Sequence, residues 1–396
     1  MQSRTLAGRL PLACALLLLA LAAPAAGDVP PEAEVEGTDA AAPEQEPDAE
    51  SADAEEPAQP ERPYQPWRRD VVAAGTSFGD VANQSPEAPL TQSAQNLRRA
   101  LGRLPEPERR WQLALTAGME FDSRPLIIGD ASNELPVPGG DADGRGVIRL
   151  GGRYRVVDWE RADVSLGFDG YWSFHFDETQ VNLQTFNPWI SGGTSVGPAR
   201  LAFRYDYAYT LFDTTEAFRH LHRLTPSVSF RQGEWGATTL FYQYNDQDYL
   251  FDTVDPATFD RDGHRHVVGA NQLFFLPAPF SYVRIGGGAD WQRADGSEWD
   301  FDGLQANFGA GYNFDYDITF GWLYRFAYRH FQNQSVFSSP ARKRDDFRHV
   351  LTVDIGKGLG EHWRLSLGGS FTWNDSDLGV YTFNRQVAGA YASYTF

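Results

Sequence analysis

Sulfur is nearly absent from this sequence: of 396 residues, one is cysteine and two are methionine. Cys14 lies in a segment that we predict to be removed on export, so the mature chain contains no thiol. A chain without cysteine forms no disulfide and no thiolate metal site. Apolar runs of roughly 20 residues are also absent after the N-terminus, which excludes a transmembrane helix from the mature chain.

Aromatic residues and glycine, in contrast, are abundant. The chain has 27 phenylalanines, 17 tyrosines and 11 tryptophans, which together make up 14% of its residues, and it has 38 glycines. Only 42% of its residues are hydrophobic. Many aromatic residues together with modest hydrophobicity are typical of β-barrels that cross a membrane with alternating strands.

Residues 1–27 have the three parts of a secretory signal peptide. Arg4 and Arg9 supply the positive charge, residues 10–22 are apolar, and Ala23-Pro24-Ala25 offers small residues for cleavage. We therefore predict export across the inner membrane. A thiol-free mature chain suits the oxidising periplasm, because stray thiols mispair there.

Two further N-terminal segments precede the barrel. Residues 28–62 form a low-complexity arm with thirteen carboxylates and one arginine, which is too polar to bury a core, so we predict disorder. Residues 63–110 form a periplasmic junction. Within it, residues 91–104 carry leucines on one stripe and predict one short helix.

From Trp111 to Phe396 the sequence has a period of two. Residues 111–122 alternate large apolar side chains with small or polar ones, and about fourteen such segments follow one another. A strand with one apolar and one polar face needs no packed core if lipid covers the apolar face. We therefore predict an all-β fold, a transmembrane antiparallel up-and-down β-barrel of about 14 strands, over residues 111–396.

The predicted connections alternate in length. Those that are mostly long and polar are residues 124–143, 177–182, 212–218, 246–264, 293–300, 331–345 and 374–380. The short ones are residues 158–163, 196–198, 232–235, 277–280, 315–317 and 359–362. Long loops outside and tight turns in the periplasm are typical of bacterial barrels. An even number of strands then places both termini in the periplasm of a Gram-negative bacterium.

The polar faces of the strands line the predicted lumen, and arginine dominates them. The residues that we expect there include Arg149, Arg153, Arg155, Arg204, Arg284, Arg325, Arg329, Asp169, Asp206 and Asp290. Because arginine is always charged and pairs with carboxylates, one interpretation is a ladder of ion pairs that fills the lumen. The other is a wet pore with an excess of positive charge, which favours anions.

Catalytic and metal sites are weakly indicated. Ser173, His175 and Asp177 share one strand face, but same-face neighbours lie roughly 7 Å apart, which is poor geometry for a Ser–His–Asp relay. The pairs His220/His222 and His264/His266 would hold a metal only weakly. We predict no enzyme, no cofactor and no metal site.

The C-terminal residues match an assembly signal. The chain closes on Tyr394-Thr395-Phe396, which places Tyr394 and Phe396 on one face of a final strand. A terminal aromatic residue on the last strand resembles the signal that the barrel-assembly machinery recognises, so that machinery is an expected partner.

The last three strands resemble a known family. Asp345-Asp346-Phe347-Arg348-His349 opens a strand, Asn374-Asp375-Ser376-Asp377 precedes Tyr381-Thr382-Phe383-Asn384-Arg385, and Tyr394-Thr395-Phe396 ends the chain. This segment is similar to the C-terminal barrel of the surface lipoprotein assembly modifiers. The resemblance implies a fourteen-stranded outer-membrane barrel, without catalytic residues, that helps to move lipoproteins across the membrane. The family's helical repeats have no counterpart here.

Three functions follow as hypotheses. The resemblance implies translocation or surface assembly of lipoproteins or other secreted proteins. The lumen charge indicates a passive, anion-favouring diffusion pore as the alternative, and a lipid-modifying enzyme is the third. The expected partners are outer-membrane lipid and lipopolysaccharide, the barrel-assembly machinery and a lipoprotein or secreted client, and we expect no binding of nucleic acid.

Overall fold

A computed structural model gives the fold of the C-terminal part of the chain. It describes residues 110–125, 142–159, 162–212, 216–250, 256–277, 281–314, 316–338 and 340–396. The predicted signal peptide, acidic arm and helix at residues 91–104 lie outside the described residues.

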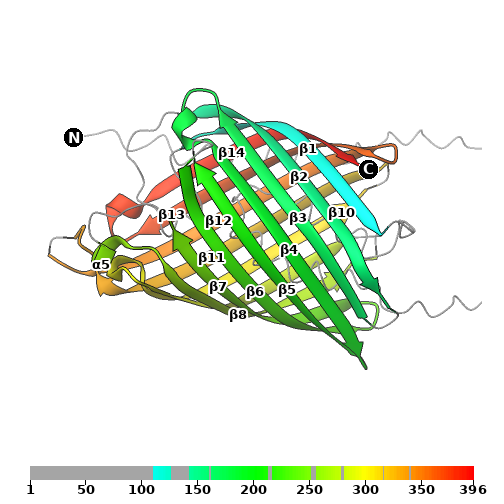
Figure 1. Cartoon of the computed structure of the whole chain (residues 1–396), viewed down its shortest axis with the longest axis horizontal. Coiled ribbons are helices and arrows are strands. Elements are labelled where there is room, and N and C mark those ends of the chain that lie inside the picture. The colour runs from blue at the N-terminus through cyan, green and yellow to red at the C-terminus, as the bar shows by residue number, and fades with distance from the viewer. Residues whose placement is uncertain are drawn as a thin grey trace, which may run out of the picture. The chain divides into compact units, whose positions relative to one another are not determined.

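Fourteen antiparallel strands close into one barrel, in which β1 pairs with β14 (Figure 1). The strands are β1 (Trp111–Asp122), β2 (Asp143–Asp158), β3 (Ala162–His175), β4 (Leu183–Val196), β5 (Ala199–Phe212), β6 (Glu216–Gln232), β7 (Gly236–Tyr249), β8 (Gly263–Phe275), β9 (Tyr282–Ala294), β10 (Phe301–Asn313), β11 (Ile318–Gln334), β12 (Lys343–Leu359), β13 (Trp363–Ser376) and β14 (Phe383–Thr395). Every other pair consists of consecutive strands. The predicted all-β, up-and-down barrel is confirmed.

The short helical elements all lie in connections at one end of the barrel. They are η2 (Thr179–Val181), α5 (Pro256–Phe259), η3 (Ser297–Trp299) and η4 (Gly379–Tyr381). In Figure 1, α5 lies at one end of the barrel and the C-terminus at the other. In the described part of the chain, no helix is long and apolar enough to cross a membrane.

The outer face of the barrel is apolar along its length. Met119, Leu304 and Leu367 expose 60% or more of their surface, and they alternate with inward neighbours such as Glu120, which is 4% exposed. Such an inverted pattern, with charges inside and leucines outside, is unfavourable in water and favourable in hydrocarbon. The strands therefore span a membrane, because a closed barrel leaves no backbone group unpaired in lipid.

Several strands run further than the sequence predicts. β7 continues to Tyr249, β11 to Gln334 and β12 begins at Lys343, so parts of the predicted loops 246–264 and 331–345 are paired strand. Backbone pairing continues past the apolar stretch because it needs no apolar side chain. A register shift between His330 and Gln334 marks the place where the β11–β12 ladder becomes irregular.

The membrane assignment predicts a depth-dependent cost of charge on the outer face. Leu367 lies inside β13, four residues after its first residue, whereas Leu359 ends β12 beside a turn, and both face outward. We expect Leu367→Arg to lower the free energy of unfolding by about 2–4 kcal/mol and Leu359→Arg by about 1 kcal/mol or less. Urea unfolding of the protein in lipid vesicles measures both values. Equal costs at the two positions would contradict a bilayer around the barrel.

Candidate functional site

The inner wall of the barrel carries far more arginines than carboxylates. On the described strands, inward positions hold Arg145, Arg149, Arg153, Arg155, Arg200, Arg204, Arg219, Arg223, Arg265, Arg284, Arg325, Arg329, Arg344, Arg348, Arg364 and Arg385. The inward carboxylates are Glu120, Asp122, Asp143, Asp163, Asp169, Asp206, Asp290, Asp346 and Asp354. All the arginines and aspartates that the sequence analysis assigned to the lumen lie on this wall.

The closure cluster joins the first and last strands of the barrel. Glu120 accepts hydrogen bonds from Arg145 Nε at 2.8 Å and from Tyr391 Oη at 2.8 Å, and Arg149 Nη2 lies 3.4 Å from it. Asp122 accepts from Arg385 Nε at 2.9 Å, and Arg145 Nη1 lies 3.4 Å from it. Three arginines thus surround two carboxylates, so this cluster carries a net positive charge.

A second cluster with a positive surplus lies on β8, β9 and β11. Arg265 binds Asp290 with two parallel hydrogen bonds of 2.8 Å, the strong bidentate form of this ion pair. Arg329 Nε lies 3.8 Å from the same carboxylate. Both guanidinium groups also lie over the ring of Phe301, at 5.8 and 4.8 Å from its centroid. Asp346 lies opposite Arg329 in the strand register and 3.4 Å from Arg344 Nε, so three arginines share two carboxylates here.

A third cluster, on β3 to β6, is balanced. Arg204 donates to Asp206 at 2.7 Å, lies 3.7 Å from Asp169, and stacks 4.5 Å from the ring of Trp189. Arg223 lies opposite Asp206 in the strand register. Two carboxylates and two arginines meet here, so the positive surplus of the lumen lies outside this cluster.

Nearer the short turns, the predicted arginines have different surroundings. Arg153 Nε donates to Ser165 Oγ at 3.1 Å, and Arg155 Nη1 lies 3.0 Å from Asp158. Arg284 alternates with the exposed Ile285, and Arg325 lies between the outward side chains of Tyr324 and Phe326. The arginine lining therefore extends over the length of the barrel.

A tightly packed group of loop residues borders the lumen at the long-connection end. Trp299, Leu378 and Tyr381 form a buried apolar cluster. Glu298 accepts hydrogen bonds from Ser335 Oγ at 2.5 Å and Tyr381 Oη at 2.9 Å. These residues belong to the connections β9–β10, β11–β12 and β13–β14, so three neighbouring connections form one unit. The guanidinium carbon of Arg344, at the start of β12, lies 3.5 Å from the ring centroid of Phe331 on β11 and 3.7 Å from that of Tyr381 in this unit.

The connection after α5 contains a carboxyl group with a perturbed pKa. Burial, together with the neighbouring carboxylates of Asp260 and Asp248, raises the pKa of Asp262 to about 6, although Asp262 accepts the Tyr249 N–H at 2.6 Å. An unfolded aspartate has a pKa of about 3.9. Folding therefore favours the protonated carboxyl group of Asp262. The resulting contribution to the stability of the folded state is complete below about pH 4 and is lost as the pH rises through about 6.

We expect this connection to open more often at about pH 8 than at about pH 5. Hydrogen exchange of the Tyr249 amide, corrected for its intrinsic pH dependence, measures the opening. The matched variant Asp262→Asn cannot ionise, and its protection should be the same at both pH values. A pH dependence that persists in Asp262→Asn would show that another group is responsible.

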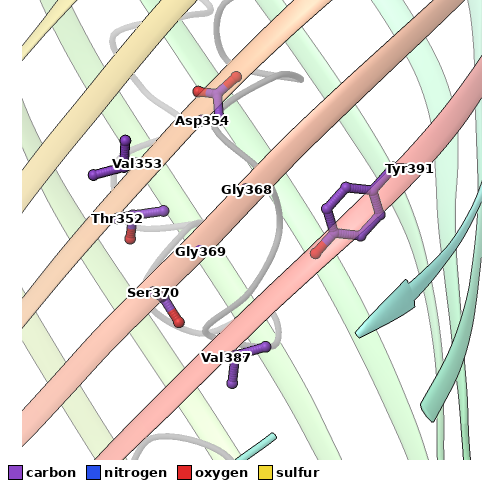
Figure 2. A pocket seen from close by; sticks show the side chains of 8 residues that line it. All are labelled: Thr352, Val353, Asp354, Gly368, Gly369, Ser370, Val387 and Tyr391. Carbon is purple, nitrogen blue, oxygen red and sulfur yellow. The ribbon is translucent and has the colours of Figure 1, made fainter. Parts of the chain in front are cut away.

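A small recess lies in the wall between β12, β13 and β14 (Figure 2). Figure 2 shows Thr352 and Asp354 of β12 on one side of β13 and Tyr391 of β14 on the other, with Gly368 and Gly369 between them. A Cβ on Gly368 would lie 3.6 Å from Tyr391 Cε2, so the missing side chains create the space. Most of the surface that lines the recess is apolar, and the recess belongs to the lumen wall.

The structure does not bring Ser173, His175 and Asp177 together as a relay. His175 Nδ1 lies 3.2 Å from Asp143 Oδ2, and its Nε2 lies 3.5 Å from Arg145 Nη1. Ser173 Oγ accepts the Leu183 N–H. Within the described residues, Ser173 and His175 form no hydrogen bond with each other, and no group of three or more His, Cys, Asp or Glu residues could hold a metal ion.

Several inward residues at the long-connection end were not predicted. Arg145 and Arg265 follow predicted loops, and Arg344 lies inside the predicted loop 331–345. Their outward neighbours are not apolar: Gly144 and Gly146 flank the first, and His264 and His266 the second. The alternation of apolar and polar residues disappears there. A count of arginines at alternate positions, without regard to the intervening residues, would have found them.

The C-terminal residues lie where the sequence suggests. Phe396 N–H donates to Leu113 O at 3.0 Å, which ties the chain end to β1. The rings of Tyr394 and Phe396 lie 4.8 Å apart on one face, and Trp363 packs edge-on against Tyr394. Their use as an assembly signal stays a prediction.

Comparisons with known proteins give only distant likenesses. No protein-family model matches the chain, and no curated protein matches it. Similar solved structures include CdiB from Acinetobacter baumannii (8% identity, TM-score 0.45, 73% of this chain and 60% of that one). Two others are the anion-selective porin from Comamonas acidovorans (10%, 0.43, 72% and 98%) and OccAB4 of A. baumannii (10%, 0.38, 74% and 100%). At these values the likenesses carry no argument about function.

Proposed function

We propose that this chain is an outer-membrane channel whose arginine-lined lumen favours small anionic solutes. The observation that carries the proposal is the excess of inward arginines over inward carboxylates on the described strands. Glu120 contacts both Arg145 and Arg149, and Asp290 contacts both Arg265 and Arg329. This excess leaves a positive potential along the inner wall. Rings of arginine in a wet pore favour anions.

The predicted signal peptide and the lipid-facing barrel together support a location in the outer membrane of a Gram-negative bacterium. The C-terminus lies at the end with the short connections, where Thr395 N–H donates to His362 O at 2.9 Å. We infer that this end faces the periplasm and that the connections with η2, α5, η3 and η4 face outward. Cysteine labelling of single-cysteine variants at Ser297 and Glu361 in intact cells tests the orientation: only the first should react.

Conductance of the purified full chain in planar bilayers tests the function. We expect steady single-channel steps and, under a potassium chloride gradient, a reversal potential with the sign of chloride preference. A preference for potassium would contradict the proposal. Absence of any conductance would favour the second candidate below.

The second candidate is translocation or surface assembly of lipoproteins or other secreted proteins. It is supported by the resemblance of β12 to β14, including Phe347, Asn384 and the C-terminal Tyr394 and Phe396, to the surface lipoprotein assembly modifiers. Deletion of the gene should then remove a lipoprotein from the cell surface without changing the uptake of small anions. The opposite pattern supports the channel.

A further inference from the structure

Histidine is concentrated on the lipid-facing side of this barrel. His220, His222, His264, His266 and His349 all alternate with inward side chains, and each lies in the half of its strand nearer the long connections. Their outward neighbours are exposed apolar residues, such as Leu224 beside His222 and Val268 beside His266. Burying an imidazole in hydrocarbon costs free energy unless its polar atoms have hydrogen-bond partners.

Two groups of these side chains have nearly the same geometry on different strands. In the β8 histidine cluster (Tyr242, Tyr244, His266 and Trp291), the Tyr242 hydroxyl lies 2.7 Å from His266 Nδ1. The ring of Tyr244 lies 5.3 Å from the imidazole at 53°, and Trp291 stacks on its other side at 5.3 Å and 13°. Tyrosine and tryptophan thus hold the imidazole in one orientation.

The β12 histidine cluster (Tyr324, Phe326, His349 and Trp373) repeats this arrangement. The Tyr324 hydroxyl lies 2.7 Å from His349 Nδ1, Phe326 lies 5.2 Å away at 52°, and Trp373 stacks at 5.3 Å and 11°. In both clusters the histidine is directly opposite the tryptophan in the strand register. The two clusters agree in three distances and two angles although they lie on different strands. This agreement indicates a repeated structural motif.

A third group, the β6 histidine cluster (Tyr205, Tyr207 and His222), has the tyrosines without the tryptophan. The Tyr205 hydroxyl lies 2.7 Å from His222 Nδ1, and the ring of Tyr207 lies 5.0 Å from the imidazole. The strand neighbour opposite His222 is Asp246. In all three clusters, a tyrosine hydroxyl therefore binds the histidine Nδ1. A second aromatic residue follows that tyrosine two positions later on the same strand.

The second ring nitrogen, Nε2, is the polar atom of each cluster that can contact the membrane. In all three, Nδ1 is engaged by tyrosine, and Nε2 forms no hydrogen bond with any residue in the described part of the chain. When the phenol donates to Nδ1, or when the ring is protonated, Nε2 carries a proton and is a donor. On the lipid-facing side, the acceptors for it are headgroup oxygens, and aromatic rings of this kind lie at headgroup level.

We propose that the three histidine clusters bind headgroup phosphates of the leaflet next to the long connections, each through Nε2–H. A phosphate oxygen is preferred over an ester carbonyl because hydrogen bonds to charged acceptors are stronger. This inference concerns the outer surface and is independent of whether the lumen conducts.

Binding of lipid A to the folded full chain tests the proposal. The probes are diphosphorylated lipid A and the same lipid after removal of both phosphates, and native mass spectrometry gives the affinity of each. We expect the wild type to prefer the phosphorylated form by about 10-fold or more, since one hydrogen bond to a charged group amounts to about a 10-fold change in affinity. The triple variant His222→Phe, His266→Phe, His349→Phe should lose this preference.

A matched control is His362→Phe, because His362 is an exposed histidine near the short turns whose Nδ1 binds Thr395 O at 2.7 Å. This variant should keep the preference. A preference that persists in the triple variant, or is missing in the wild type, would overturn the proposal.

If the triple variant does not fold, nitrogen NMR of the wild type decides. Phosphorylated lipid should shift the Nε2 resonances of the three cluster histidines and leave that of His362 unchanged. Unshifted cluster resonances would overturn the proposal.

Discussion

Replacing Arg149 and Arg329 together with glutamine should lower the chloride-over-potassium permeability ratio by about 16-fold. A unit charge about 10 Å from an ion in water changes its energy by about 0.4 kcal/mol, with opposite sign for chloride and potassium, so each arginine removed changes the ratio by a factor of about 4. These two arginines are the second partners of Glu120 and Asp290, at 3.4 and 3.8 Å. Their loss leaves each carboxylate bound to its nearer arginine, so the barrel should fold normally.

The control is Arg293→Gln, which removes one positive charge from the outer face, where Arg293 pairs with Asp302. Reversal potentials in a salt gradient, measured in planar bilayers, compare the variants. The control should leave the permeability ratio unchanged. A double variant with wild-type selectivity would show that the surplus arginines do not act on the permeating ion.

Removal of the Asp122 side chain should cause the largest loss of stability of any single substitution considered for this barrel. Asp122 is fully buried and joins β1 to β14 through Arg385, with Arg145 beside it. Asp122→Ala leaves Arg385 buried without this carboxylate, and breaking a buried ion pair in this way costs about 3–5 kcal/mol. Because the pair lies on the seam where the chain ends meet, we expect the barrel to open there first.

Asp302→Ala provides the comparison, since the Asp302–Arg293 pair is half exposed and its 2.7 Å contact is open to water. Exposed pairs contribute about 1 kcal/mol or less. Urea titrations in detergent, followed by tryptophan fluorescence and by heat-modifiable gel mobility, give both values. Equal losses for the two variants would mean that the Asp122 pair is hydrated in the folded protein.

Much of the barrel could be predicted from the sequence because the alternation of apolar and polar residues is a local property. The alternating segment at residues 111–122 coincides with β1, Trp111–Asp122. Each residue's face follows from its parity alone, so Arg149, Arg204 and Asp290 could be assigned to the lumen without knowledge of any neighbour. Strand ends were less accurate, because pairing continues beyond the apolar stretch, as at Gln334.

The pairing between side chains could not be predicted from the sequence, because the partners come from distant parts of the chain. Asp122 and Arg385 are 263 residues apart, and only closure of the barrel brings them together. In the sequence, His175 shares a strand face with Asp177, but in the structure its carboxylate partner is Asp143. The histidine pairs on β6 and β8 looked like weak metal ligands, whereas the sheet places tyrosines against them.

The sequence by itself determined the class of fold and the face on which each side chain lies, because a period of two is a property of a single strand. Only the tertiary structure decided which charges neutralise one another, where positive charge is left over and which rings enclose each histidine. These features depend on strand register and on the meeting of β1 with β14. Both are set by contacts between residues far apart in the chain, and local patterns do not encode them.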